Sequence, residues 1–407
     1  MEAAAKWTHE DDPCPCRYAG VLARDSEERP PKHDAEIHDV RRMSDSTMPD
    51  EAWAGPLPTI LDALRARRVI APYLSRTPLV RAPALDRLLG ARVFVKCENL
   101  LPTGAFKVRG GINLVHALTA EERRRGIITA STGNHGQSIA YAARAFGVRA
   151  TIVAPRGNNP LKVAAMRALG AEVVLEGRDF DEAREWTERT AASEGLRYVH
   201  SANEPLLIAG VGTASLEIFD EVPDVDVIIA PIGAGSGACG HCIVAKTLNP
   251  AVRVIGVQAE GANPVERSLR EGRMVRLDRL HTFAEGIATR VPFALPLAIL
   301  RAHLDEAVLV SDEELRRAIL VLAEAVRQTA EGAGAASTAA ALRLRDRLRG
   351  RTVVLILSGG NITLDTLHEI YADRARVDAV TGMLRAPVGA GDDPAIAALG
   401  PAEGGRV

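Results

Sequence analysis

Short apolar runs rich in Val and Ile alternate with segments of helical periodicity along most of this chain. Strands that are apolar along their whole length and separated by helices are typical of parallel sheets covered on both faces. The sequence therefore predicts an α/β fold with mostly parallel sheets. The predicted strands are residues 93–95, 127–130, 151–153, 173–175, 227–230, 252–257, 308–310 and 352–357. The predicted helices lie near residues 57–68, 135–146, 160–169, 180–194, 211–221, 311–329 and 337–349, with two more beginning at residue 107 and after residue 237.

Composition excludes several classes of partner. The 407 residues carry a formal net charge of -2, which does not favour nucleic acid or an anionic membrane surface. No apolar run is long enough to cross a bilayer, and the N-terminus lacks the apolar region of a signal peptide. The five cysteines do not form a disulfide framework. We therefore expect a cytoplasmic protein.

Both ends of the chain differ from the rest. Residues 1–50 are polar, rich in Asp, Glu, Arg and Pro, and without a sustained period, so we expect a disordered extension. Residues 376–407 are rich in Gly, Pro and Ala, and we expect a flexible tail there.

A lysine at the start of a predicted helix stands out within residues 98–111. Lys107 follows Gly104 and Phe106, and the helical pattern begins at the lysine itself. The positive end of a helix dipole and partial burial both disfavour a cation, so both lower the pKa of the amine. More of it is then neutral and nucleophilic. Taken alone, the stretch is explained equally well by a solvated surface lysine.

Two loops that follow predicted strands are suited to binding anions. In residues 131–136, Ser-Thr-Gly-Asn-His-Gly, backbone N–H groups converge at the start of a helix, which suits a carboxylate or phosphate. A plain N-cap with turn glycines is the alternative. In residues 231–237, Pro-Ile-Gly-Ala-Gly-Ser-Gly, the missing side chains let amides approach a phosphate closely. The following strand does not end in an acidic residue, so a single phosphate is favoured over a dinucleotide.

Two further features are open to two interpretations. Ser358 follows the last predicted strand, where ligands bind in open α/β sheets, although Ser358-Gly359-Gly360 is also ordinary turn chemistry. Cys239 and Cys242 form a Cys-x-x-Cys pattern inside a predicted helix. We expect both thiols to pack as small apolar groups rather than to act as a redox pair.

Four segments, namely residues 98–111, 131–136, 231–237 and 357–361, occur in this order. Together they resemble the fold-type II pyridoxal-phosphate enzymes, and within them the threonine/serine dehydratase (ammonia-lyase) branch that includes serine racemases. The resemblance covers about residues 57–375. It implies two three-layer α/β/α domains with mostly parallel sheets, as in tryptophan synthase β, with the cofactor in the cleft between them. The implied large domain comprises residues 51–125 and 204–375, and the small domain comprises residues 126–203.

The resemblance also implies roles for individual residues. Lys107 would hold pyridoxal 5'-phosphate covalently, against the ring of Phe106. The phosphate would lie among Gly233, Ala234, Gly235, Ser236 and Gly237. Asn134, Glu331 and Ser358 would contact the cofactor ring. The substrate carboxylate would bind Ser131, Asn134 and His135.

The implied reaction is α,β-elimination of L-threonine or L-serine to a 2-oxo acid and ammonia, in a homodimer or homotetramer. Ser358 is neutral and cannot keep the pyridine nitrogen protonated, which suits early departure of a β-leaving group. The departures from the family pattern keep alternatives open. Thr132 stands where racemases have a serine that acts as the second acid, so a serine or aspartate racemase is one alternative. Another is a dehydratase of 3-hydroxyaspartate or of a hydroxyectoine catabolite. Glu217 lies where some relatives bind a divalent cation, but Pro223 breaks the acidic pattern, and we expect no metal.

Overall fold

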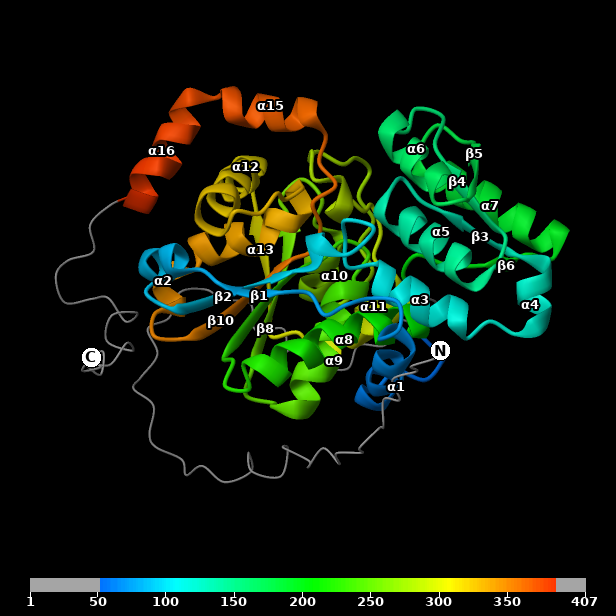
Figure 1. The fold of residues 1–407 in the computed structure, drawn as a ribbon, viewed down its shortest axis with the longest axis horizontal. Helices are drawn as coiled ribbons and strands as arrows, with labels where there is room; N and C mark the ends of the chain where they lie inside the picture. Colours follow the sequence, from blue (N-terminus) through cyan, green and yellow to red (C-terminus); the bar gives the residue numbers. More distant parts are fainter. Residues whose placement is uncertain (1–51, 386–407) are drawn as a thin grey trace, which may run out of the picture. The chain divides into compact units, whose positions relative to one another are not determined.

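The computed structural model describes residues 52–385 and contains two sheets (Figure 1). The predicted disordered extension, residues 1–50, lies outside the described residues, as does the predicted tail beyond residue 385. The α/β class and the mostly parallel sheets are confirmed.

The larger sheet has six strands in the order β1-β2-β10-β7-β8-β9. Only β1 runs antiparallel to its neighbour, and the other pairs are parallel. The last strand of the chain therefore lies between strands from its beginning and its middle. These strands are β1 (Leu79–Arg81), β2 (Arg92–Cys97), β7 (Val227–Pro231), β8 (Arg253–Ala259), β9 (Glu306–Val310) and β10 (Thr352–Leu357).

Helices cover both faces of this sheet, as the uniformly apolar strands require. Val353 and Leu355 of β10 face one core, shared with α2, α12 and α13, whereas Val354 and Ile356 face the other, shared with α1, α8, α9 and α11. The helices of the first face are α2 (Pro83–Leu89), α12 (Asp312–Val321) and α13 (Gly332–Arg343). Those of the second face are α1 (Ile60–Ile70), α8 (Pro205–Glu221), α9 (Ser236–Leu248) and α11 (Ala294–His303).

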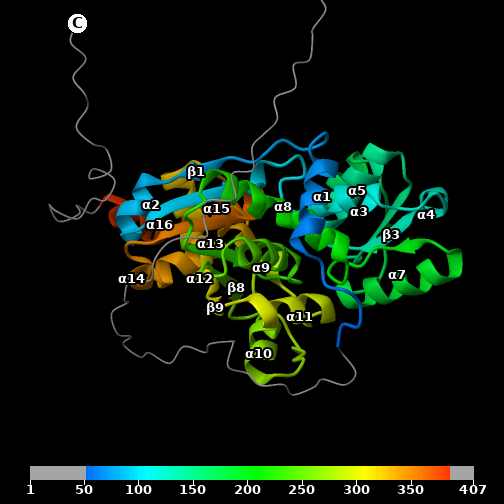
Figure 2. The ribbon, with the colours of Figure 1, turned by 90° about the horizontal axis from the view of Figure 1, so that it is seen from below.

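The smaller sheet has four parallel strands in the order β5-β4-β3-β6. Ile127 and Ile152 pack toward α3, α5 and α6, whereas Ile128 and Val153 pack toward α7. All four strands lie within the predicted small domain, and Figures 1 and 2 both show this group beside the larger sheet. Its strands are β3 (Ile127–Ala130), β4 (Ala150–Ala154), β5 (Glu172–Leu175) and β6 (Arg197–Tyr198). The helices on this side are α3 (Val108–His116), α4 (Ala120–Arg125), α5 (Asn134–Phe146), α6 (Pro160–Ala168) and α7 (Phe180–Glu194). Helices α3 and α4 precede residue 126 and so fall within the range predicted for the large domain, although α3 packs on the smaller sheet.

Helices α3 and α8 approach each other at backbone distance. A Cβ atom at Gly110 would lie 2.8 Å from the carbonyl oxygen of Leu207, and one at Gly210 would lie 2.6 Å from that of Arg109. Contacts this short leave no room for a side chain, so the two glycines set the separation of the helices. Because α3 begins directly after Lys107, this contact also positions the lysine.

Several expected boundaries differ from the structure, as three examples show. Helix α8 begins at Pro205, six residues before its predicted start, and it is buried on nearly all sides, so it lacks the amphipathic period that marks a surface helix. Helix α13 begins at Gly332 rather than near residue 337, because its glycines lie against other backbone. The expected flexible tail from residue 376 is wrong up to residue 385, since α16 continues to Arg385 and buries Val380.

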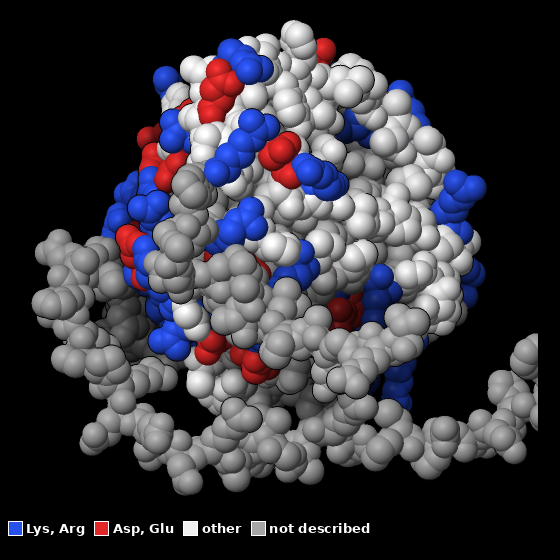
Figure 3. All heavy atoms as spheres, turned by 60° about the vertical axis from the view of Figure 1, so that its left-hand side comes forward, with Lys and Arg blue, Asp and Glu red and all other residues white. Residues whose placement is uncertain are grey.

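The remaining helices connect these layers. They are η3 (Glu98–Leu100), α10 (Pro264–Glu271), η4 (Glu285–Ile287), the π-helical turn η5 (Leu322–Val326), α14 (Arg345–Leu348), α15 (Leu364–Ala372) and α16 (Arg374–Arg385). Within residues 52–385, no helix has both the length and the apolar content needed to span a membrane. On the face shown in Figure 3, basic and acidic side chains adjoin one another, as the small net charge leads one to expect.

Candidate active site

Lys107 lies at the start of α3, as predicted. It lines two adjoining cavities, a wider one that reaches the loop 131–135 and a narrower one that reaches the loop 233–237. Its amine is 5.6 Å from the centre of the Phe106 ring. Burial lowers the pKa of this amine, and the charge of Glu331 opposes that shift only in part. A larger fraction of the amine is therefore neutral near pH 7 than for an exposed lysine, which favours nucleophilic and basic chemistry.

The predicted phosphate loop forms the wall of the narrower cavity. It joins the end of β7 to the start of α9, so the backbone N–H groups of the first turn of α9 point toward the cavity. Gly235 has a φ of +103°, a conformation that side chains disfavour. A Cβ at Gly233 would lie 2.5 Å from the carbonyl oxygen of Gly286, and one at Gly237 would lie 3.2 Å from the Phe106 ring. The loop is thus shaped to admit an anion against bare backbone.

The same cavity brings together all the residues predicted to contact the cofactor. Its lining contains Phe106, Lys107, Asn134, Gly233, Ala234, Gly235, Ser236, Gly237, Glu331 and Ser358. These residues come from five separate parts of the sequence, and the roles assigned to them remain predictions.

Asn134 is held by a hydrogen-bonded chain that sequence reasoning did not find. Its Nδ2 donates to Oε1 of Glu331 at 2.6 Å, and its Oδ1 accepts from Nδ2 of Asn361 at 2.8 Å. Asn361 also donates to the carbonyl oxygen of Thr103. An amide nitrogen has two protons, so Asn134 keeps one for a ligand in the cavity. Asn361 was visible in the sequence directly after Ser358-Gly359-Gly360, but nothing in its spacing indicated a partner 227 residues away.

Glu331 has an unusual acidity. Burial raises its pKa from the ordinary 4.5 to about 7, although Lys162 and the amide of Asn134 favour the charged form. Its carboxyl lies against backbone, because a Cβ at Gly359 would be 2.5 Å from Oε1. Near neutral pH this group can therefore hold or release a proton inside the cavity.

This raised pKa predicts a pH-dependent stability of the cofactor-free protein. The folded state holds the proton of Glu331 up to about pH 7, whereas the unfolded chain releases it near pH 4.5. Stability from this group is therefore greatest at low pH and is lost as the pH rises through 7. We expect wild type to lose roughly 2–3 kcal/mol relative to Glu331→Gln between pH 5 and pH 8. Urea unfolding of both proteins across this range checks it, and parallel curves would contradict the assignment.

The predicted carboxylate loop forms one end of the wider cavity, at the start of α5. Oγ of Ser131 accepts the backbone N–H groups of Gly133 and Gly136, at 3.1 and 2.8 Å, so its own proton is left to donate. Thr132, Asn134 and His135 line the same cavity. A carboxylate there would meet hydroxyl donors and the positive end of the helix dipole.

His135 is a buried ring held by hydrogen bonds. Its Nε2 lies 3.0 Å from Oγ1 of Thr129, whose hydroxyl also donates to the carbonyl oxygen of Val199 at 2.7 Å. Burial and the nearby charge of Lys107 hold its pKa well below the ordinary range. His135 is thus suited to supplying its backbone and a neutral ring rather than a positive charge.

Ser358 and Thr132 face the cavities as predicted but are only lightly constrained. Oγ of Ser358 is 3.4 Å from the carbonyl oxygen of Ala333, which makes a weak hydrogen bond. Thr132 is half-buried, and its backbone carbonyl accepts from Asn158. Both hydroxyls can therefore turn toward a ligand.

Arg109, two residues after Lys107, belongs to a buried cluster of charges. Arg109 donates to Glu98 at 2.7 Å and to Glu217 at 2.7 Å, and Lys96 reaches Glu217 at 2.6 Å. The carboxylate of Glu217, considered above as a metal ligand, is therefore paired with two cations. Within residues 52–385 no group of three His, Cys, Asp or Glu side chains is arranged to hold a metal ion.

Cys239 and Cys242 are free thiols, buried in the core that the larger sheet shares with α1, α8, α9 and α11. Burial raises the pKa of both thiols.

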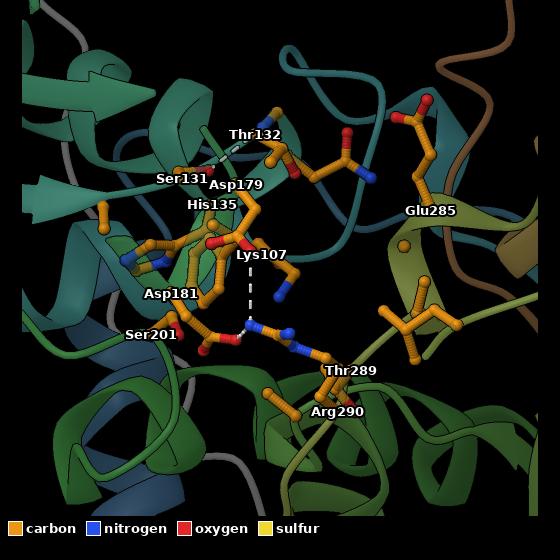
Figure 4. A pocket seen from close by; sticks show the side chains of 18 of the residues that line it. Lys107, Ser131, Thr132, His135, Asp179, Asp181, Ser201, Glu285, Thr289 and Arg290 are labelled. Carbon is orange, nitrogen blue, oxygen red and sulfur yellow. Dashed lines mark hydrogen bonds and ion pairs between the residues drawn. The ribbon is translucent and has the colours of Figure 1, made fainter. Parts of the chain in front are cut away.

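The other wall of the wider cavity carries charged residues that sequence reasoning missed. Lys162 pairs with Glu285. Arg290 pairs with Asp179 and Asp181 (Figure 4). Both pairs join the segment 285–290 to the helices beside the smaller sheet. Their partners are 109 or more residues apart in sequence, and no motif relates them.

Comparison with known proteins places this chain in a family. Residues 70–359 match the family described as pyridoxal-phosphate dependent enzyme. The chain is 42% identical over 312 residues to the L-threonine ammonia-lyase of Thermotoga maritima, which covers 77% of this chain and 78% of that protein. The crystal structure of T.th. threonine deaminase superimposes with a TM-score of 0.72 at 38% identity, over 75% of this chain and 99% of that one. Maize serine racemase gives 0.74 at 30% identity, over 80% and 100%.

This protein belongs to the pyridoxal-phosphate-dependent enzymes, and its fold is that of the fold-type II group. Its cofactor is pyridoxal 5'-phosphate. The resemblance inferred from the four sequence segments is confirmed.

Proposed function

We propose that this enzyme is an L-threonine ammonia-lyase that also accepts L-serine. Elimination of the β-hydroxyl and the α-proton, followed by hydrolysis of the released enamine, converts L-threonine into 2-oxobutyrate and ammonia. The observation that carries the proposal is a neutral hydroxyl, Ser358, in the same cavity as the amine of Lys107 and the glycine cradle. The names of relatives at 36–42% identity support it.

The residues of the narrower cavity fit the cofactor. The loop 233–237 offers backbone amides to a phosphate where any Cβ at Gly233 would clash, and Lys107 offers an amine with a lowered pKa. Asn134 keeps one amide proton for a ring oxygen, and Phe106 supplies a flat apolar surface. When bound, pyridoxal phosphate provides the electron sink that makes the α-proton of an amino acid removable.

Lys107 and the α5 loop then divide the remaining work. The carboxylate of the substrate would be held by the hydroxyl of Ser131 and the amides at the start of α5. The neutral amine of Lys107 would accept the proton from Cα, because its lowered pKa keeps a lone pair available. Glu331, with its pKa of about 7, is able to exchange a proton within the same cavity near neutral pH.

A panel of hydroxy-amino acids tests the proposal directly. We expect L-threonine and L-serine to give 2-oxo acid and ammonia in equal amounts with the cofactor-loaded enzyme. Oxo-acid formation is measured by coupled reduction, and enantiomer composition by chiral chromatography. Formation of D-serine from L-serine without oxo acid would make racemisation the main activity instead.

Racemisation is the second candidate because Thr132 places a hydroxyl on the cavity wall, and serine racemases are among the structural neighbours. Thr132→Ala removes this hydroxyl while keeping a small side chain. We expect it to abolish any racemisation and to leave elimination within about threefold, since Lys107 rather than Thr132 takes the α-proton. Equal loss of both activities would contradict this division of roles.

We further propose that the enzyme acts in the cytoplasm as a homodimer or homotetramer. The buried free thiols Cys97, Cys239 and Cys242 are consistent with a reducing compartment. Sedimentation velocity of the full chain measures the assembly state.

A further inference from the structure

The wider cavity has a charged wall opposite the carboxylate loop. Arg290 contacts Asp181 and lies 3.4 Å from Oδ2 of Asp179. Figure 4 shows the guanidinium of Arg290 directed into the cavity between the two aspartates, toward the space that the Lys107 amine also faces. All three residues line the cavity, and they do so beside Ser201 and Thr289. A ligand held at the α5 loop and near Lys107 therefore presents its side chain to this wall.

The three charged groups are held in place from both sides. Asp179 is the N-cap of α7, and its Oδ1 accepts the backbone N–H of Glu182 while Oδ2 faces Arg290. The Arg290 carbonyl accepts the N–H of Leu277, and the neighbouring Thr289 hydroxyl reaches the carbonyl of Gly233. The arginine is thus fixed to the phosphate cradle and the aspartates to the start of a helix. An arrangement fixed at both ends presents the same charges to every ligand.

The balance of charge on this wall is negative. One guanidinium faces two carboxylates, so the trio of Asp179, Asp181 and Arg290 carries a formal charge of -1. An uncharged hydroxymethyl or hydroxyethyl side chain would meet this wall without electrostatic penalty. A side-chain carboxylate would meet two like charges, and the guanidinium of Arg290 is already engaged with them.

We propose that Asp179 and Asp181 determine substrate specificity by masking Arg290. The masked arginine excludes amino acids with a carboxylate side chain, such as aspartate and 3-hydroxyaspartate, and leaves the cavity selective for small neutral hydroxy-amino acids. This inference rests on the proposed function, because it takes the α5 loop as the site of the substrate carboxylate. It disfavours the aspartate racemase and 3-hydroxyaspartate alternatives.

Two four-carbon acids provide the test, since neither has an amine that could react with the cofactor. Succinate carries a second carboxylate, and butyrate carries a methyl group in its place. Their dissociation constants are measured by calorimetry on the cofactor-loaded enzyme. In wild type we expect succinate to bind no more tightly than butyrate. In the double variant Asp179→Asn, Asp181→Asn we expect the preference for succinate to rise roughly tenfold, the gain of one hydrogen-bonded charge pair. Asparagine caps a helix as well as aspartate does, so α7 is retained.

Two further variants make the result specific. Adding Arg290→Gln to the double variant should remove the gained preference for succinate. Glu176→Gln is the matched control, because it takes a carboxylate from another arginine, Arg156, without touching the cavity lining. It should bind both acids as wild type does.

Several outcomes would overturn the inference. They are a tenfold preference for succinate already in wild type, an unchanged ratio in the double variant, and an absence of succinate binding to that variant. Equal weakening of both acids would show that the trio only holds the cavity together. Turnover of L-threonine by the same wild-type preparation reports separately on the proposed function. If L-threonine were not turned over but the binding ratio still shifted tenfold, the proposed function would be wrong, whereas the masking of Arg290 would be supported.

Discussion

Lys107→Ala should lower threonine deamination by on the order of 10³-fold and should remove the visible absorption of the bound cofactor. The amine is both the expected point of covalent attachment and the group placed to accept the α-proton, so its loss removes two functions at once. Absorption spectra after cofactor loading and dialysis, together with oxo-acid formation, measure the two effects. Mass spectrometry after borohydride reduction should find the cofactor on the peptide that contains Lys107.

Lys162→Ala is the matched control for this result. Lys162 is a second lysine of the same cavity, but its amine is engaged with Glu285. We expect this variant to keep the visible band. A visible band that survives in Lys107→Ala, or that vanishes only in Lys162→Ala, would contradict attachment of the cofactor at Lys107.

Arg109→Leu should destabilise the protein by about 3–5 kcal/mol, because it leaves the buried carboxylates of Glu98 and Glu217 without their shared partner. Arg109 is 1% exposed and donates to both carboxylates as well as to Thr213. Its pKa is raised because, although burial disfavours the charge, the two glutamates stabilise it more strongly. Urea unfolding gives the free energy of unfolding directly.

Two comparisons test the reason given for this loss. Combining Arg109→Leu with Glu98→Gln should recover part of the stability, since one uncompensated charge is removed with it. Arg65→Leu breaks an exposed ion pair with Asp62 and should have little effect. If the buried and the exposed arginine gave similar losses, the cluster would not be the stabilising element described here.

Eight of the ten strands in the described residues, and the position of Lys107 at a helix start, could be read from the sequence, whereas the short strands β1 and β6 were not predicted. β3 and β10 were predicted with their observed bounds because a strand buried on both faces is an uninterrupted apolar run bounded by turns. Lys107 and the loop 233–237 were found because their chemistry is local: a glycine turn, a strand end and a helix start lie within a few residues. Local signals of this kind do not depend on the rest of the fold.

What escaped prediction depends on contacts between distant segments. The partners of Arg290 are more than 100 residues away, and a charged residue in a loop is ordinarily solvated. Asn361 gains its role only when β10 brings it beside the start of α5. The early start of α13 was missed because its glycines suggest a loop, although Gly334 lies against the backbone of Gly359 and Gly332 lies against Ala284. Helix α16 was missed because the Gly- and Pro-rich residues after it dominated the composition of the tail.

The backbone contact between α3 and α8 has a consequence for how chains of this type can diverge. Where two helices meet through main-chain atoms, those atoms set how closely the helices can approach. Exchanges among Leu, Ile and Val around this contact change little volume, so we expect them to leave Lys107 in place. A single added methyl group at Gly110 or Gly210 has no such freedom, so we expect these two positions to drift far less than the hydrophobic residues around them.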